Sequence, residues 1–229
     1  MNKAAAKGQR RGASDIALRG EIISTALRMN SSGLTPGKSG NVSARIDSGM
    51  LITPTGMTYG ELKPADIVAV RSDGSVMAGQ RIPSSEWRFH LAIYKAREDV
   101  EAIVHTHSLN ATALACIHRS IPAFHYMVAV AGGDRIVCSP YATYGTETLA
   151  KHVVRALGER RACLIANHGA VAVGETLRKA YDLAWEVETL AAQYARARQL
   201  GRPRLLTARE MTQVLEKFKS YGKQTPVKL

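Results

Sequence analysis

The segment AIVHTHSLNATAL, residues 102–114, contains a predicted strand that leads directly into a predicted helix. Residues 102–104 are apolar, and two histidines follow at 105 and 107. A short apolar run of this kind is typical of a buried strand. Ser108 can cap the helix that follows, because its side-chain oxygen can accept a hydrogen bond from a backbone N–H. A second apolar strand, residues 162–166, ends similarly at Asn167-His168-Gly169. The fold is therefore expected to carry polar side chains at the carboxyl ends of buried strands.

Further strands and helices surround these two strands. Short turns join the predicted strands 42–46 and 50–53 into one hairpin, and 66–71 and 75–78 into another. Helices are predicted from Ser14, from Ser84-Ser85, from Ser108, over 146–157, over 175–200, and from Thr207 to about Tyr221. Because tight hairpins join antiparallel strands, this order predicts an α/β fold with a mixed, mainly antiparallel sheet flanked by helices.

The length and composition fit a globular protein. The chain has 229 residues, of which 45% are hydrophobic and 22% charged, so a disordered or collagen-like chain is excluded. No low-complexity linker or internal repeat divides the sequence. We therefore expect a flexible basic tail over residues 1–13 and one domain over residues 14–229. No apolar run approaches the roughly 20 residues of a membrane-spanning helix, so no membrane partner is expected.

The chain is strongly basic. Lys and Arg number 31 and Asp and Glu 19, which gives a formal net charge of +12. Such a charge is compatible with a nucleic-acid partner, but the sequence has no basic block and no zinc-finger spacing. An anionic small-molecule substrate explains the charge equally well. The N-terminus lacks the apolar segment of a secretory signal and the three cysteines form no CxxC motif, so we expect a cytoplasmic protein that binds no nucleic acid.

Three histidines are candidate metal ligands. His105 and His107 alternate at the end of a predicted strand, so both side chains point to the same face. Two imidazoles placed in this way can bind one divalent metal. His168 follows the carboxyl end of the other apolar strand, where α/β folds commonly bind ligands. The alternative for each is an ordinary core, surface or turn histidine.

Ser84, Ser85 and Glu86 combine two hydroxyls and a carboxylate at the start of a predicted helix. The free backbone N–H groups and partial positive charge of a helix N-terminus favour a phosphate. Glu86 is a candidate general base on such a substrate; its alternative role is that of an ordinary acidic residue in a first helical turn. Two turns can present further N–H groups to an anion, although such turns also serve simply as hairpin connections. They are Gly40-Asn41 and Thr55-Gly56.

Together these segments resemble the class II aldolase and adducin family, from about residue 15 to residue 222. The segments that carry the resemblance are SGNVSARI (39–46), LITPTGMTY (51–59), PSSEWRFH (83–90), IVHTHSLNATAL (103–114), RSIPAFHYM (119–127), AGGDRIVCSPYATYGT (131–146), NHGAVAV (167–173) and VLEKFKSYG (214–222). The resemblance implies three αβα layers around the sheet. It also implies a metal-dependent aldehyde-lyase that is a homotetramer, with active sites at subunit interfaces.

The resemblance gives each candidate residue a role. One zinc ion per subunit would be bound by His105, His107 and His168, and Glu86 would also reach the ion in the resting enzyme. The substrate phosphate would lie against Gly40, Asn41, Thr55, Gly56, Ser84 and Ser85. Tyr126 would reach the active site of a neighbouring subunit. Tyr144 and Tyr221 would lie near the substrate, and Tyr144 stands where a phenylalanine is expected in members that act on fuculose phosphate.

The reaction that the resemblance implies is the reversible cleavage of a ketose 1-phosphate, L-fuculose 1-phosphate in the first instance. The products would be dihydroxyacetone phosphate and a short aldehyde, L-lactaldehyde. Zinc would act as a Lewis acid, Glu86 would move the proton at the dihydroxyacetone carbon, and Tyr126 would protonate the aldehyde oxygen in the condensing direction.

Three alternatives accompany this interpretation. Two are related enzymes: a sugar-acid phosphate decarboxylase, and a pentulose-phosphate 4-epimerase, in which an aspartate is expected at the position of Glu86. The third is a non-enzymatic adducin-like structural module. The presence of all three histidines and of Glu86 favours an enzyme over such a module.

Overall fold

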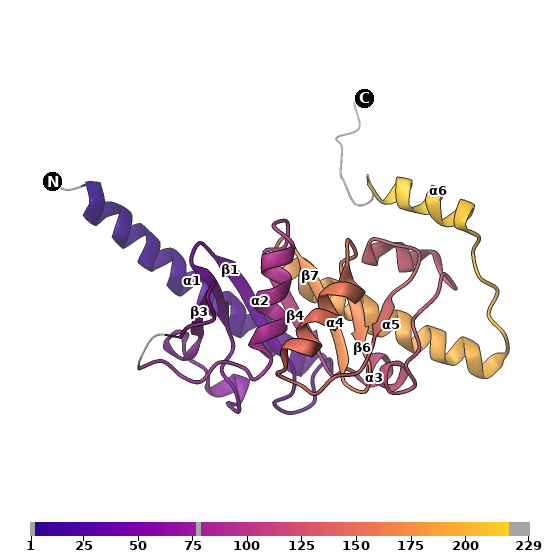
Figure 1. Ribbon diagram of the computed structural model, residues 1–229, viewed down its shortest axis with the longest axis horizontal. Coiled ribbons are helices and arrows are strands. Elements are labelled where there is room, and N and C mark those ends of the chain that lie inside the picture. Colours follow the sequence, from indigo (N-terminus) through magenta and orange to yellow (C-terminus); the bar gives the residue numbers. More distant parts are fainter. Residues whose placement is uncertain (1–2, 77–78, 220–229) are drawn as a thin grey trace, which may run out of the picture.

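The computed structural model describes residues 3–76 and 79–219, with side chains from Asp15 onward. Seven strands in this part of the chain form one sheet, in the order β3-β2-β1-β4-β7-β6-β5 (Figure 1). They are β1 (Asn41–Ile46), β2 (Gly49–Ile52), β3 (Val68–Arg71), β4 (Ala102–Thr106), β5 (Val137–Ser139), β6 (Ala162–Ile165) and β7 (Gly169–Gly174). Neighbouring strands are antiparallel except β5 and β6, which are parallel. The predicted mixed, mainly antiparallel sheet is confirmed.

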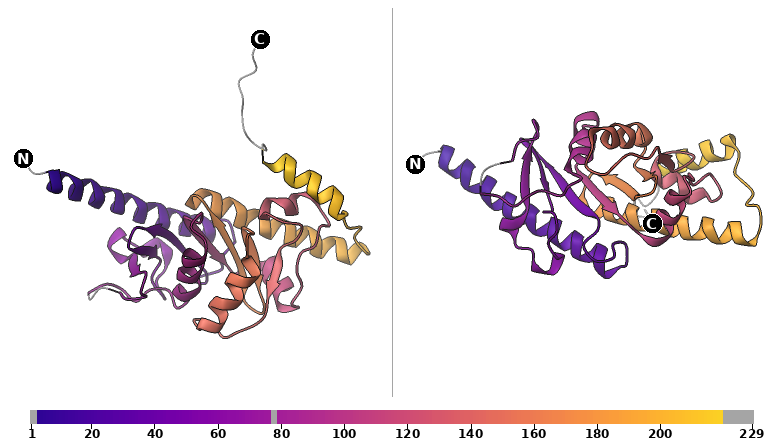
Figure 2. Two further views of the ribbon diagram at one scale, coloured as in Figure 1. Left: turned by 45° about the horizontal axis from the view of Figure 1, so that its top comes forward. Right: turned by 60° about the horizontal axis from the view of Figure 1, so that its bottom comes forward.

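Helices cover both faces of the sheet, which confirms the three αβα layers (Figures 1 and 2). One face is covered by α1 (Lys3–Ser31), α3 (Leu109–Cys116) and α5 (Leu177–Leu200). The other is covered by α2 (Trp87–Ala96) and α4 (Glu147–Leu157). Alternate residues of each strand enter the two cores: on β4, Val104 packs toward α5 and Ile103 toward α2.

The remaining helices are short or peripheral. Three 3-10 helices are η1 (Tyr59–Glu61), η2 (Pro64–Asp66) and η3 (Tyr126–Ala131). Helix α6 (Ala208–Phe218) lies away from the sheet (Figure 1) and packs on η3, with Met211 buried beside Ala129. The predicted Thr207–Glu210 capping box starts α6, whereas its predicted end near Tyr221 lies outside the described residues. Within residues 3–76 and 79–219, no helix is long and apolar enough to cross a membrane.

The first helix starts earlier than predicted. α1 begins at Lys3 instead of Ser14, so the backbone of most of the predicted tail is helical. The physical reason is composition, because Ala, Lys, Arg and Gln dominate residues 3–10 and have high helix propensities. The division into a flexible tail over residues 1–13 and one domain over residues 14–229 stays a prediction.

The predicted strand 75–78 is described only as far as Val76, and this part pairs with β3 without forming a regular strand. Ser75 O accepts a hydrogen bond from Arg71 N at 2.9 Å and Val76 makes an isolated antiparallel bridge with Val70, whereas residues 77–78 lie outside the described ranges. On β3, the backbone N–H of Ala69 donates a hydrogen bond to the side-chain oxygen of Gln80 at 2.8 Å. The backbone N–H of Ala69 is thus satisfied by a side chain instead of by the backbone of a neighbouring strand. The periodicity of the sequence does not predict such a contact.

Candidate metal centre and active site

Three adjacent strands, β1, β4 and β7, bring the candidate ligands to one edge of the sheet. Asn41 at the start of β1 pairs with His105 near the end of β4, and His105 pairs with Val171 on β7. His107 follows the end of β4, and His168 lies in the turn between β6 and β7. Sheet pairing therefore joins three sequence segments that are far apart along the chain.

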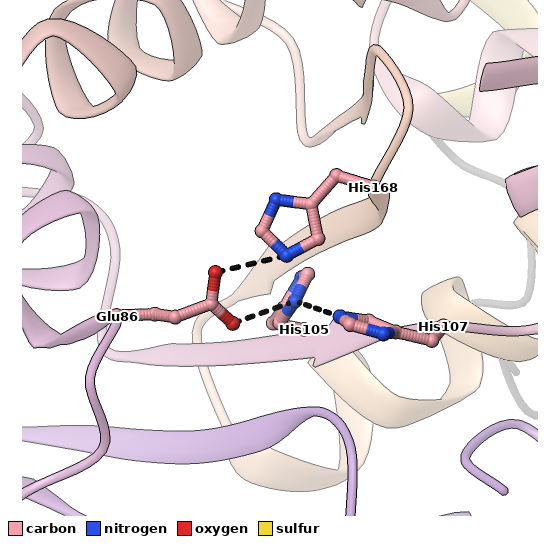
Figure 3. A group of neighbouring side chains, drawn as sticks. All are labelled: Glu86, His105, His107 and His168. Atoms are coloured by element: carbon pink, nitrogen blue, oxygen red, sulfur yellow. Dashed lines mark hydrogen bonds and ion pairs between the residues drawn. The ribbon is translucent and has the colours of Figure 1, made fainter. Parts of the chain in front are cut away.

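Glu86, His105, His107 and His168 form one cluster, with one possible ligand atom of each within 4.8 Å of the others (Figure 3). His105 Nε2 lies 2.9 Å from Glu86 Oε2 and 2.9 Å from His107 Nε2. Glu86 Oε1 lies 2.9 Å from His168 Nε2. A tetrahedral zinc ion with bonds of about 2.0–2.1 Å separates its ligand atoms by about 3.3 Å. The cluster thus has the dimensions of a site for one divalent ion.

The hydrogen bonds around His105 leave its Nε2 free to bind a metal. Its Nδ1 lies 2.9 Å from the carbonyl oxygen of Ala170, which can only accept, so Nδ1 carries the proton and donates. In a neutral ring, Nε2 then presents a lone pair to a carboxylate oxygen and to another imidazole. The buried Oε1 of Glu86 also makes no hydrogen bond of good geometry within the described residues. A bound cation would satisfy these facing lone pairs, so the residues present fit a metal ion.

Burial and neighbouring charges act in opposite directions on Glu86. Burial raises the pKa of Glu86, but the charge and hydrogen bonds of His105 and His168, when these rings are protonated, lower it more in total, so this pKa lies below its ordinary value. Burial lowers the pKa of His107 to about 3, and the neighbouring His105 and His168 act in the same direction. At neutral pH, Glu86 is therefore ionised and His107 is neutral. These are the protonation states in which both side chains bind a metal.

A cavity of about 320 Å³ opens beside the cluster and is lined by Glu86, His107 and His168. All six predicted phosphate-binding residues line the same cavity: Gly40, Asn41, Thr55, Gly56, Ser84 and Ser85. Two backbone hydrogen bonds hold their segments together, from Ser84 N to Thr53 O at 3.0 Å and from Thr55 N to Ile82 O at 3.1 Å. The structure therefore brings the predicted phosphate loops and the ligand cluster into one cavity.

The N-cap of the helix beside these loops is Glu86, the residue after the predicted cap Ser84-Ser85. α2 starts at Trp87, and the N–H of Glu86 approaches Ser84 Oγ at 3.4 Å. Ser84 and Ser85 thus precede the helix and line the cavity. The backbone N–H of Ser84 donates to Thr53 O, so it is through their hydroxyls that the two serines can bind an anion.

Asn41 has contacts beyond its predicted role at the phosphate. Its Nδ2 donates to Glu86 Oε2 at 3.1 Å, and its Oδ1 lies 2.5 Å from His90 Nε2. Ser43 Oγ lies 2.7 Å from His90 Nδ1 and 2.9 Å from the hydroxyl of Tyr94. Burial lowers the pKa of His90 to about 3, so its ring is neutral. The sequence analysis missed this network, because His90 lies within a helical pattern and has no neighbouring histidine.

Lys38 is the main cavity residue that the sequence analysis missed. Its Nζ donates to the carbonyl oxygen of Gly56 at 3.2 Å, which holds a positive charge beside the predicted phosphate loops. The glycine turn that contains Lys38 was the available signal, since a cation beside such a turn favours an anion. The other lining residues not predicted are Ser39, Pro54, Tyr141, Ala142 and Asn167.

The three candidate tyrosines have different outcomes. Tyr144 lines the cavity, as predicted. Tyr126 starts η3, is 47% exposed and does not line this cavity in its own chain, so its role in a neighbouring subunit stays a prediction. Tyr221 lies outside the described residues.

Gly40 and Gly56 provide a matched test of the loop geometry. Both have left-handed backbone angles, with φ of 87° and 73°. A Cβ on Gly40 would lie 2.7 Å from the carbonyl oxygen of His105 and 2.7 Å from Thr35 Cγ2, whereas a Cβ on Gly56 would meet nothing within 4 Å. Gly56→Ala should lower the free energy of unfolding by about 1–2 kcal/mol, the cost of the backbone conformation alone. Gly40→Ala should cost clearly more than about 2 kcal/mol, because it also displaces β4.

Urea unfolding of the two variants measures this difference. Gly40→Ala should also lower the metal content of the purified protein, since His105 must move with β4. Equal losses of stability in both variants, with unchanged metal content, would contradict this description of the loop.

Known proteins identify the family. Residues 20–195 match the family described as "Class II Aldolase and Adducin N-terminal domain". The chain is 52% identical over 209 residues to the 5-methylthioribulose-1-phosphate/5-deoxyribulose-1-phosphate aldolase of Rhodospirillum rubrum, covering 91% of this chain and 94% of that protein. It is 48% identical over 203 residues to the L-fuculose phosphate aldolase of Escherichia coli K12, covering 88% and 94%. A solved structure of L-fuculose 1-phosphate aldolase gives a TM-score of 0.86 at 41% identity, covering 89% of this chain and 96% of that one.

These relatives are named as enzymes and match over nearly their full lengths. The alternative of a non-enzymatic adducin-like module is therefore wrong. The expected αβα fold is also that of the solved relative. The chain belongs to the class II aldolase and adducin family and is a class II aldolase.

Proposed function

We propose that this protein is a zinc-dependent aldolase that cleaves a ketose 1-phosphate to dihydroxyacetone phosphate and a short aldehyde. The observation that carries the proposal is the single cavity lined by Glu86, His107 and His168 of the ligand cluster and by the phosphate loops. In a ketose 1-phosphate the carbonyl carbon is one carbon away from the carbon that bears the phosphate. Such a substrate therefore needs an anion site and a metal site close together.

The proposed zinc site consists of His105, His107 and His168, with Glu86 as a fourth ligand in the resting enzyme. Three imidazoles and a carboxylate suit zinc, at one ion per subunit. When bound, the ion would supply Lewis-acid stabilisation of the negative charge that forms on the substrate as the C–C bond breaks.

The side chains of the cavity would bind the substrate and move its protons. Lys38, Ser84 and Ser85 would hold the phosphate, together with the two glycine turns. In the condensing direction the ionised Glu86 would take a proton from C3 of dihydroxyacetone phosphate, the C3–C4 bond would form, and the aldehyde oxygen would take up a proton. Cleavage is the reverse, in which the proton lost by the C4 hydroxyl is balanced by the proton that C3 receives through Glu86. Tyr126 of the partner subunit would exchange the proton of the aldehyde oxygen. This last role requires an oligomer, for which we propose a homotetramer, and we place the enzyme in the cytoplasm.

L-fuculose 1-phosphate is the first candidate substrate and 5-deoxyribulose 1-phosphate the second. Relatives named for the two activities are similarly close, at 48% and 52% identity. Tyr144 supports keeping the second candidate, because a tyrosine stands here where a phenylalanine is expected in fuculose-phosphate enzymes, and it lines the cavity. Glu86, where 4-epimerases are expected to have an aspartate, favours cleavage over epimerisation.

Release of dihydroxyacetone phosphate from each substrate tests this proposal. We expect zinc-loaded protein to release it from at least one of the two, a chelator to abolish release, and added zinc to restore it. The ratio of the two kcat/KM values then assigns the aldehyde. A zinc-loaded protein that releases dihydroxyacetone phosphate from neither substrate would contradict the proposal and favour the decarboxylase or epimerase alternatives.

A further inference from the structure

We propose that His90 is a positioning residue for Glu86 and acts through the side-chain amide of Asn41, an inference that rests on the proposed function. Five buried side chains form one hydrogen-bonded chain that ends at the Glu86 carboxylate: Tyr94, Ser43, His90, Asn41 and Glu86. Each is at most 6% exposed, so water does not compete for their hydrogen bonds.

The fold creates this chain by matching two periodicities. Glu86, His90 and Tyr94 follow one another at intervals of four residues, from the N-cap of α2 through the helix, so they lie on one face. Asn41 and Ser43 alternate on β1 and therefore share the face of the sheet that α2 covers. The two sets interdigitate, with each β1 side chain bridging two residues of the α2 face.

The direction of the hydrogen bonds follows from Glu86. An ionised carboxylate only accepts, so the NH₂ group of Asn41 must face Glu86 Oε2 and its oxygen must face His90. His90 Nε2 must then carry the ring proton and donate it to Asn41 Oδ1. In a neutral imidazole this makes Nδ1 an acceptor.

The outer half of the chain follows from the same argument. Ser43 must donate to His90 Nδ1, which leaves the oxygen of Ser43 to accept from the hydroxyl of Tyr94. Every donor in the chain therefore points toward Glu86, and only one orientation of the Asn41 amide is compatible with His90. That orientation holds Glu86 Oε2 where it faces His105 Nε2, at 2.9 Å.

Loss of the His90 donor should free the Asn41 amide to rotate and release the Glu86 carboxylate. Outer partners of this kind change metal affinity or activity by about 10- to 100-fold when they are removed. We therefore expect His90→Leu to lower kcat by about 10- to 100-fold, with KM changed less than about threefold.

A pair of polar substitutions separates positioning from mere space-filling. In His90→Gln the side-chain amide reaches the place of Nε2 and can still donate to Asn41. In His90→Asn the shorter amide reaches only the place of Nδ1, next to Ser43. The Gln variant should recover most of kcat and the Asn variant should not. Ile93→Val is the matched control, since Ile93 is equally buried on α2 but lies outside the chain.

Two measurements do not depend on turnover: the zinc dissociation constant, from competition with a chelator, and the visible absorption spectrum of the cobalt-loaded protein. Zinc binding should weaken by about 10- to 100-fold and the cobalt spectrum should change in the Leu and Asn variants, but neither should change for Gln or Ile93→Val. If His90→Leu does not fold, the Gln and Asn pair decides.

The inference would be overturned if the His90→Asn variant had the same kcat, zinc affinity and cobalt spectrum as the wild-type protein. If the proposed function were wrong, the wild-type protein itself would release no dihydroxyacetone phosphate. In that case the zinc affinities and cobalt spectra still decide whether His90 positions Glu86.

Discussion

Glu86→Gln is expected to lower kcat by about 10²- to 10⁴-fold, the usual range for loss of a general acid–base group. The amide of glutamine cannot take up or release a proton at neutral pH, although it keeps nearly the shape of the carboxylate. His105, His107 and His168 remain, so the variant should still bind one zinc ion per chain. Initial rates of dihydroxyacetone phosphate release and metal analysis of the same sample check both expectations.

The control for this experiment is Glu98→Gln, which removes the same group from an exposed position between α2 and β4. It should retain full activity and full zinc content. Full activity in Glu86→Gln would refute the assignment of Glu86 as the proton-transferring group, whatever its contact with the metal.

His107→Ala is expected to abolish zinc binding and activity together. The variant keeps only two imidazoles and Glu86, and it opens the cluster on the side where His107 lines the cavity. Zinc content should fall from one per chain to near zero after dialysis. Because Lewis-acid stabilisation contributes several kcal/mol, kcat should fall by at least about 100-fold.

His152→Ala is the matched control, since His152 lies on α4 outside the cluster. It should keep both zinc and turnover. Circular dichroism of both variants verifies that they fold. If His107→Ala retained stoichiometric zinc and wild-type turnover, His107 would not be a metal ligand.

Local rules predicted where the candidate ligands lie along the strands, and the resemblance to the family implied that they bind one metal ion. Alternation along β4 places His105 and His107 on one side, and the end of β6 places His168 at the same edge of the sheet. The hairpins likewise predicted the antiparallel part of the sheet. What the local rules did not contain was the pairing of β1, β4 and β7, which brings the histidines, Glu86 and the phosphate loops together.

The remaining parts of the site depend on contacts between distant elements. His90 carries no mark in the sequence until α2 packs on β1 and places its ring between Asn41 and Ser43. Lys38 becomes a cavity residue only because the loop before β1 folds against Gly56. Similarly, the N–H of Ala69 on β3 donates to the Gln80 side chain, a contact that periodicity does not predict. Tertiary contacts of this kind override local patterns.

A zinc titration of metal-free protein, followed as dihydroxyacetone phosphate release from the better of the two ketose 1-phosphates, tests the central claim most directly. We expect no release without zinc, a linear rise in rate as zinc is added, and a sharp break at one zinc per chain. A rate that is the same with and without zinc, or that never rises above the uncatalysed rate, would contradict a metal-dependent aldolase built on His105, His107, His168 and Glu86.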